Sequence, residues 1–144
     1  LTGLTTLAGF ELSSERIATS LDSGDPEDEH SCFSDQTHND IRANFNGIKN
    51  IYLGINSKGE RFSPSVSDLV AKNNPSLNAS IISKLKEVSN NIEDITVPFD
   101  KMLLESNDGP GRIAAEKTVN NLLALAENFK KAGKELNWQV IISE

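Results

Sequence analysis

The sequence predicts an all-α protein, an up-and-down four-helix bundle, and three observations predict it. Four long segments carry apolar residues at alternating spacings of four and three, which places those residues on one face of a helix. Turn-forming residues separate the segments, most clearly Asn107-Asp108-Gly109-Pro110-Gly111. The strict apolar–polar alternation of β-strands is found nowhere beyond the short tail at 138–142. Amphipathic helices of this kind bury their apolar faces against one another, as in a bundle.

The first helix is expected over residues 1–22. Its apolar face is predicted to hold Leu7, Phe10, Ser14, Ile17 and Leu21. Acidic residues lie on a neighbouring face, which favours a solvated surface because charged side chains are seldom buried: Glu11, Glu15 and Asp22. The helix is expected to end at Ser23-Gly24-Asp25-Pro26, since glycine commonly follows a helix and proline cannot continue one.

The second helix is expected to begin near Ser34 or Asp35, either of which can cap it. Its apolar series is Ile41, Phe45, Ile48, Tyr52 and Ile55. Extended backwards, the same series reaches His38 and then Ser34, so His38 is predicted to point inward. The glycines at 54 and 59 bound a turn that ends the helix.

A short extra helix is expected in the connection between the second and third long helices, with Ser65 as its cap and Asp68 in its first turn. The third long helix is predicted over residues 76–106, with a kink caused by Pro98. Its apolar series follows the 3.5-residue repeat of a left-handed bundle: Ile81, Leu85, Val88, Ile92, Ile95, Phe99 and Met102.

The fourth long helix is predicted over residues 112–137. Small residues in its apolar series allow a neighbour to approach closely: Ala115, Val119, Leu122, Ala126, Phe129, Gly133 and Leu136. The tail at 138–142 is expected to add either a last turn or an extended end.

Composition narrows the functional classes. The net charge of −7 with scattered acidic residues argues against nucleic-acid binding, which depends on basic contacts to phosphate, but not against metal cations. A single cysteine forms no internal disulfide, and no apolar run is long enough for a transmembrane span. The 144 residues suit one domain, 1–144. Because the chain opens on Leu1 within an expected helix, we expect it to be a processed or excised part of a longer product.

The candidate site is the segment 27–40, which we call the linker segment. It holds both histidines, the only cysteine and five carboxylates, where an irregular linker becomes a helix. Imidazole together with carboxylate suits zinc, iron or copper. The candidate metal ligands are therefore His38, His30 and Glu29.

Each of these residues also has a structural interpretation. His38 is either a ligand or a core histidine satisfied by Thr37, Ser34 or a backbone carbonyl, and Cys32 is either a soft ligand or nucleophile or a small buried side chain. Asp35 and Asp40 either take part in a site or cap the helix start. A Cys-His catalytic pair lacks any recognisable oxyanion hole.

The linker segment also resembles a known family. The following residues carry the resemblance: Glu29-His30-Ser31-Cys32-Phe33-Ser34-Asp35, then Thr37-His38, Asp40-Ile41, Gly47-Ile48 and Tyr52-Leu53-Gly54. Together they are similar to the signature of imelysin-like proteins, the insulin-cleaving metallopeptidase family, with the iron-regulated protein A group closest. Leu69-Val70, Pro98-Phe99-Asp100 and the upstream pair Glu15-Arg16 extend the resemblance over most of the chain.

The resemblance implies an all-helical bacterial protein of two related bundles, in the periplasm or at the outer membrane, associated with iron uptake. It implies a site between the two bundles. The family's Gly-x-His-x-x-Glu motif, which belongs to the first half, is absent here, so the chain resembles the second half alone. The resemblance thus implies that a first, N-terminal half is the partner of this chain.

Two functions follow as hypotheses. The first is a module of iron uptake that contributes one wall of an interdomain site for a metal, an iron complex or another ligand, with iron or zinc as the possible metal. Its candidate ligand-binding residues are Glu15, Arg16, Glu29, His30, Ser31, Cys32, Ser34, Asp35, Thr37, His38 and Asp40. The second is a zinc-type metallopeptidase whose Gly-x-His-x-x-Glu motif lies in the first half. Because no His-Glu-x-x-His arrangement is present, the residues favour binding over catalysis.

Overall fold

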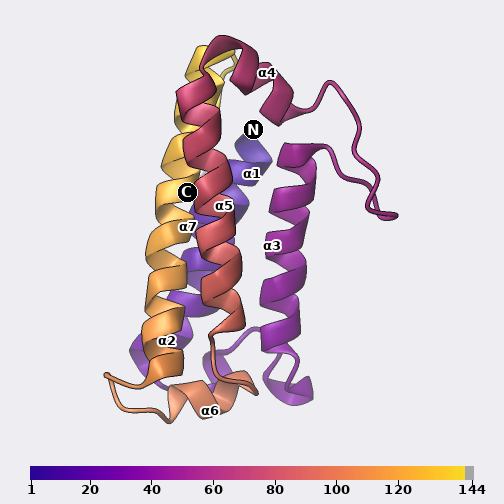
Figure 1. Ribbon diagram of the computed structural model, residues 1–144. Helices are drawn as coiled ribbons and strands as arrows, with labels where there is room; N and C mark the ends of the chain where they lie inside the picture. Colours follow the sequence, from indigo (N-terminus) through magenta and orange to yellow (C-terminus); the bar gives the residue numbers. More distant parts are fainter. Residues whose placement is uncertain (142–144) are drawn as a thin grey trace.

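The computed structural model describes residues 1–141, and over this range the protein is all-α, as predicted (Figure 1). Long helical rods run alternately down and up the bundle, and short helices cover its two ends. The first rod joins α1 (Thr2–Thr6), a π-helix η1 (Leu7–Ala18) and α2 (Thr19–Ser23), and the others are α3 (Thr37–Leu53), α5 (Pro75–Glu93) and α7 (Pro110–Glu135). The short helix α4 (Val66–Asn73) lies at the end where the chain starts, and α6 (Phe99–Leu103) lies at the opposite end.

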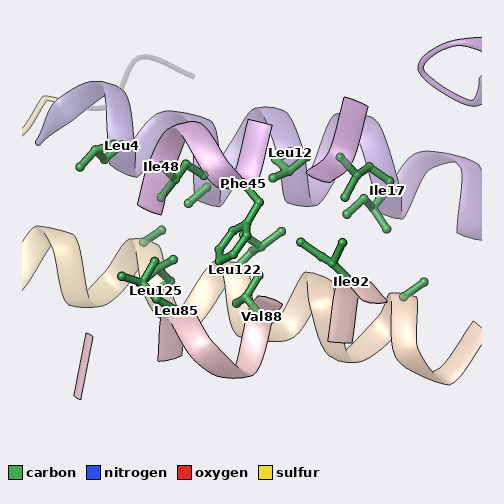
Figure 2. Packing of buried hydrophobic residues seen from close by; sticks show 14 of the residues in the cluster. Leu4, Leu12, Ile17, Phe45, Ile48, Leu85, Val88, Ile92, Leu122 and Leu125 are labelled. Carbon is green, nitrogen blue, oxygen red and sulfur yellow. The ribbon is translucent and has the colours of Figure 1, made fainter. Parts of the chain in front are cut away.

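One continuous cluster of buried apolar side chains fills the space between the rods. Figure 2 shows Phe45 of α3 in its middle, facing Leu122 of α7 and Val88 of α5. The periodic series predicted for the third helix is buried at every position, from Ile81 to Met102. These series therefore located the core correctly in α3, α5, α6 and most of α7.

The first rod departs from the predicted face because its middle is π-helical. Phe10 is 40 % exposed, and Leu7 and Ser14 are half-buried, although all three were expected on the core face. The apolar side chains that fill the core recur instead at steps of four and five: Leu4, Ala8, Leu12, Ile17 and Leu21. A π-helix closes its hydrogen bonds over five residues instead of four, so each turn holds more residues and the buried face follows a longer period.

The third long helix breaks where a kink was predicted. The helix α5 ends at Glu93, and a separate helix α6 begins after Pro98, which is its N-cap. Proline disfavours helical geometry in the residue before it and has no N–H to donate, so the helix stops instead of bending. The break carries α6 across the end of the bundle (Figure 1).

The second long helix begins at Thr37, later than the predicted Ser34 or Asp35. Asp35 has a left-handed backbone with φ of 52°, which ends the preceding turn, and Gln36 occupies the N-cap. Ser34 is consequently exposed instead of continuing the inward series, and Thr37 is fully buried.

Other local predictions are confirmed. Gly24 ends α2 in a left-handed conformation, and Ser65 and Asp68 form a reciprocal capping box at α4. The acidic residues Glu11, Glu15 and Asp22 are exposed. The tail is not helical as far as Ile141, and Ile142 lies outside the described residues. None of the described helices is both long and apolar enough to cross a membrane.

Candidate functional site

The linker segment lies at the end of the bundle that α6 covers (Figure 1). It folds as two single turns of 3₁₀-helix, η2 (Pro26–Asp28) and η3 (Cys32–Ser34), before α3 begins. The carboxylate of Asp25 accepts a hydrogen bond of 2.9 Å from the backbone N–H of Glu27, which caps η2. Local turns of this kind place Glu29, between η2 and η3, against the first turn of α3.

Glu29 is the buried acid of the site, with 6 % of its surface exposed. It lies near Thr37, which is also buried and whose Oγ1 accepts a 2.9 Å hydrogen bond from the backbone N–H of Ser31. The Oε2 atom of Glu29 is buried and has no hydrogen-bond partner within the described residues. A buried carboxylate oxygen without a partner is costly, because it has given up hydration and gained nothing in return.

The electrostatics of Glu29 reflect this burial. Loss of hydration raises the pKa of the Glu29 carboxyl above its ordinary value, and the neighbouring carboxylates of Asp100 and Asp35 raise it further. The Thr37 hydroxyl and His38 act in the opposite direction. A cation placed beside Glu29 would relieve the same penalty.

His38 follows Thr37 in the first turn of α3 and is half-buried, in accord with the predicted inward position. Its Nδ1 atom is buried and, like Glu29 Oε2, makes no hydrogen bond to any residue in 1–141. Buried polar atoms nearly always have partners, so each of these two unpartnered atoms indicates a ligand, a water molecule or a further protein segment beside it.

Asp40 organises the outer side of the site. Its Oδ2 atom accepts a hydrogen bond from the Ser31 hydroxyl and lies 3.9 Å from Nε2 of His30. These contacts tie η3 to α3 and direct His30 toward Asp40. His30 and His38 therefore have different surroundings, since His30 lies beside a carboxylate and the buried Nδ1 atom of His38 has no hydrogen-bond partner within residues 1–141.

The remaining residues of the linker segment form the surface around this pair. Phe33 is fully exposed, Ser34 and Asp35 are exposed, and Cys32 is half-buried with a free thiol. Two further apolar side chains near α6 are exposed at the same end, Val97 by 47 % and Leu104 by 77 %. The end of the bundle that holds the linker segment thus also carries exposed apolar side chains.

Glu15 and Arg16 lie on η1, Glu15 exposed and Arg16 half-buried. Neither makes a hydrogen bond or ion pair with the linker segment in the part of the chain that the structure describes. The structure therefore does not join these two residues to the group around Glu29.

Asp100 is the residue that sequence reasoning did not place in the site. It lies in the first turn of α6, and its charge acts on Glu29 across the bundle end. The sequence did indicate Asp100 indirectly, because the Pro98-Phe99-Asp100 segment resembles the family. That resemblance does not say that Asp100 lies near the linker segment.

The unpartnered atoms of Glu29 and His38 are of the kinds that bind metals, but two atoms are too few to complete a metal site. A carboxylate oxygen and an imidazole nitrogen without partners are typical ligands for zinc or iron. Within residues 1–141, however, no three histidine, cysteine or acidic side chains are grouped closely enough to hold a metal ion.

The model of the imelysin family, a peptidase family by its designation, matches residues 1–129. No curated protein matches the chain.

Proposed function

Because this chain belongs to the imelysin family of bacterial proteins, we propose that it forms one wall of an interdomain site that serves iron uptake. The ligand of the site is a metal ion or an iron complex. The other wall is the first bundle of an imelysin-like protein, and the protein acts in the periplasm or at the outer membrane.

One observation carries the proposal: Glu29 Oε2 and His38 Nδ1 are both buried and both without a partner. Glu29 comes from the linker and His38 from the first turn of α3, and the charge of His38 acts to lower the pKa of the Glu29 carboxyl. Fold stability alone would favour hydrogen-bonded or apolar groups at these positions. A ligand-binding role explains why a carboxylate and an imidazole are kept there.

The residues that would hold a metal are Glu29 and His38, and a bound cation would supply the positive charge that the Glu29 carboxylate lacks. Thr37 lies beside Glu29 and helps to orient its carboxyl group. Asp40 and Ser31 hold the linker against α3, so that Glu29 stays in place. The remaining ligands have to come from the partner wall or from the bound complex itself.

The exposed apolar side chains support a partner wall at this end. Phe33, Val97 and Leu104 are large and exposed around the same bundle end, whereas single exposed apolar residues are ordinarily scattered. A second bundle that covered them would also exclude water from Glu29 and His38. Exclusion of water strengthens the binding of a cation by a carboxylate.

The second candidate function is a metallopeptidase, which the family designation favours. Peptidase chemistry needs a metal with an open position and a general base. Residues 1–141 offer His38 and Glu29 as possible ligands, but hold no grouped set of three. The base and the remaining ligands would have to lie in the first half.

Titration calorimetry with zinc and with ferrous iron tests the proposal on the two-bundle protein. Glu29→Gln and His38→Ala should each weaken binding by about tenfold or more, because each removes one ligand. Glu116→Gln is the matched control, since Glu116 is an exposed carboxylate on α7. Equal affinity of all three variants would contradict the proposal.

Proteolysis assays on the same samples separate the two functions. Turnover of a peptide substrate that a chelator abolishes would favour the peptidase, and stoichiometric binding without turnover would favour the uptake module. Native mass spectrometry of the bacterial product will show whether the first bundle is part of the same chain.

A further inference from the structure

A second candidate site lies on the side of the bundle, in a groove between α3 and α5. The groove has a volume of about 300 Å³ and is lined by Lys49 and Leu53 of α3 and by Ile82, Leu85, Lys86, Ser89 and Asn90 of α5. This volume is at the lower end of the range for small-molecule sites. Lys49 is twelve residues beyond Thr37, which is about 18 Å along the helix, so the groove is separate from the linker segment.

The register of the two helices places Lys49 opposite Lys86. Nearer the linker end, Arg42 of α3 pairs with Glu93 of α5, with 3.1 Å between Arg42 Nη2 and Glu93 Oε2. Because α3 and α5 are antiparallel, seven residues further along α3 correspond to seven residues back along α5. Seven residues are two turns, so Lys49 and Lys86 occupy the positions at which Arg42 and Glu93 pair.

The same cross-helix position therefore holds an ion pair at one level and two like charges at the next. Neither Lys49 nor Lys86 makes an ion pair with any residue in 1–141. Two other helical lysines do so within their own helices, Lys84 with Glu87 and Lys130 with Glu127. In a protein of net charge −7, two lysines that line one groove without acidic partners among residues 1–141 concentrate positive charge locally, and this charge attracts anions.

The floor of the groove is apolar, which indicates that an anion bound there carries an apolar group. Leu85 is buried, Leu53 is half-buried, and Ile82 remains 44 % exposed beside Lys86. These side chains extend from the two lysines toward the α4 end of the bundle. The groove thus joins a cationic end to an apolar strip.

We propose that this groove binds a small amphiphile that carries a single carboxylate. The carboxylate lies between the ammonium groups of Lys49 and Lys86, where it accepts a charge-assisted hydrogen bond from each. The apolar part lies along Leu53, Ile82 and Leu85. Ser89 and Asn90 provide further polar contacts at the cationic end.

The shape of the groove favours a compact ligand over a docked helix. Toward the linker end the same boundary between α3 and α5 is closed by the Arg42–Glu93 pair, and only about 20 Å³ remains there beside Phe45 and Ile92. A docked helix needs an apolar strip of several turns. The open part spans only the two turns of α5 from Ile82 to Asn90, or about 12 Å.

Calorimetric titration of the 144-residue chain with decanoate, in metal-free buffer, tests the proposal. We expect saturable binding of one decanoate per chain. Lys49→Gln and Lys86→Gln should each weaken it by about tenfold, which is the effect of losing one charge-assisted hydrogen bond. Decanol, which has the same alkyl chain and no charge, should bind about tenfold more weakly than decanoate.

Lys58→Gln is the matched control, because Lys58 is an exposed lysine in the loop after α3 and makes no ion pair among the described residues. Its affinity for decanoate should equal that of the unmodified chain. Circular dichroism of each variant establishes that the fold is kept. Non-saturating binding, or equal affinity in the Lys49, Lys86 and Lys58 variants, would overturn the proposal.

Two further tests, one with a peptide and one with the linker variants, distinguish this site from others. A glutamate-rich amphipathic peptide that binds the groove while decanoate does not would also overturn the proposal, in favour of a protein partner. Decanoate binding that survives Glu29→Gln and His38→Ala would support a groove independent of the linker segment. Loss of binding in those two variants, with no effect at Lys49 and Lys86, would contradict it.

Discussion

Glu105 is a single side chain that caps a helix of this bundle. The first backbone N–H groups of a helix have no acceptor within the helix, and Glu105 provides one. The helix α7 has Gly109 at its N-cap and so lacks a capping side chain there. Glu105 takes that role from the preceding loop: its Oε2 atom accepts hydrogen bonds from the N–H groups of Gly111 and Arg112, at 2.9 and 3.1 Å. The Thr96 hydroxyl donates to its other oxygen. A carboxylate at this point also interacts favourably with the dipole of the helix.

These contacts predict a pH-dependent contribution to stability. The hydrogen bond from Thr96 and those from the amides of α7 lower the pKa of the Glu105 carboxyl below its ordinary value of 4.5. A lowered pKa in the folded state means that the stabilisation is fully present above pH 4.5 and is lost as the pH falls through the folded-state pKa. Glu105→Gln should therefore lower the free energy of unfolding by about 1 kcal/mol at pH 7.

Urea denaturation of both proteins at neutral and acidic pH measures the effect. The difference between them should shrink in acid, because the carboxyl of the unmodified chain is then protonated too. Glu116→Gln, an exposed change on the same helix, should change stability by less than about 0.5 kcal/mol. A difference that stays constant with pH would show that the charge of Glu105 does not contribute.

Gly9 provides a second prediction at the residue scale. A Cβ atom at Gly9 would lie 2.7 Å from Cβ of Ala126, so the first rod and α7 approach closely only because position 9 is glycine. Gly9→Ala should destabilise the protein by about 1–3 kcal/mol through overpacking. Gly47→Ala is the control, because α3 leaves open space around that position and alanine favours a helix by about 0.5–1 kcal/mol. Thermal unfolding should give opposite shifts of Tm for the two variants, and shifts of the same sign would contradict the close packing.

At the scale of elements, periodicity predicted the helices and most of their buried faces. It succeeded for α3, α5 and α7 because an α-helix keeps one angular step, and the core then follows from spacing alone. The predicted burial of Phe10 was wrong because η1 is a π-helix with more residues per turn than an α-helix. No local pattern in the sequence predicted the π-helix. Periodicity and Pro98 together predicted a kink, whereas the helix breaks after Glu93. A proline predicts that a helix is disrupted, but not whether it bends or ends.

The candidate site was predictable to a similar degree. The composition of the linker segment indicated Glu29 and His38, and the apolar series gave the inward position of His38. The proximity of Asp100 to Glu29 was not predictable, because it depends on where the break at Pro98 carries α6. Contacts between segments far apart in the sequence arise from packing and not from local pattern.

The facing lysines of α3 and α5 give a prediction at the same scale. Lys86→Glu should create an ion pair with Lys49 that repeats the Arg42–Glu93 pair two turns away. Because both side chains are near solvent, the expected gain in the free energy of unfolding is only about 0.2–1 kcal/mol. Urea denaturation at low and high salt measures it, and the gain should decrease at high salt. Lys58→Glu is the control for the change in net charge, and an equal effect in both variants would contradict the facing arrangement.

At the scale of the molecule, the core is one cluster shared by all four rods, and the short helices α4 and α6 also contribute to it. Tyr52 illustrates the connection. Its ring lies 5.4 Å from that of Phe129 on α7, and its hydroxyl donates a 2.7 Å hydrogen bond to Asn78 Oδ1 on α5. The same oxygen accepts a hydrogen bond from Ser67 of α4. A substitution in one of these four helices is therefore expected to alter the packing of the other three.

A shared core of this kind predicts that residues 1–144 unfold as one cooperative unit, which also tests whether they form one domain. Far-UV circular dichroism, which reports helix content, and the near-UV signal of the aromatic side chains, which include the buried Tyr52, should give the same Tm. The calorimetric and van't Hoff enthalpies should also agree. Tyr52→Phe removes the hydroxyl that links α3 to α5 and should lower the free energy of unfolding by about 1 kcal/mol while keeping the transition single. A helix signal that falls before the near-UV signal would instead show that part of the bundle separates first.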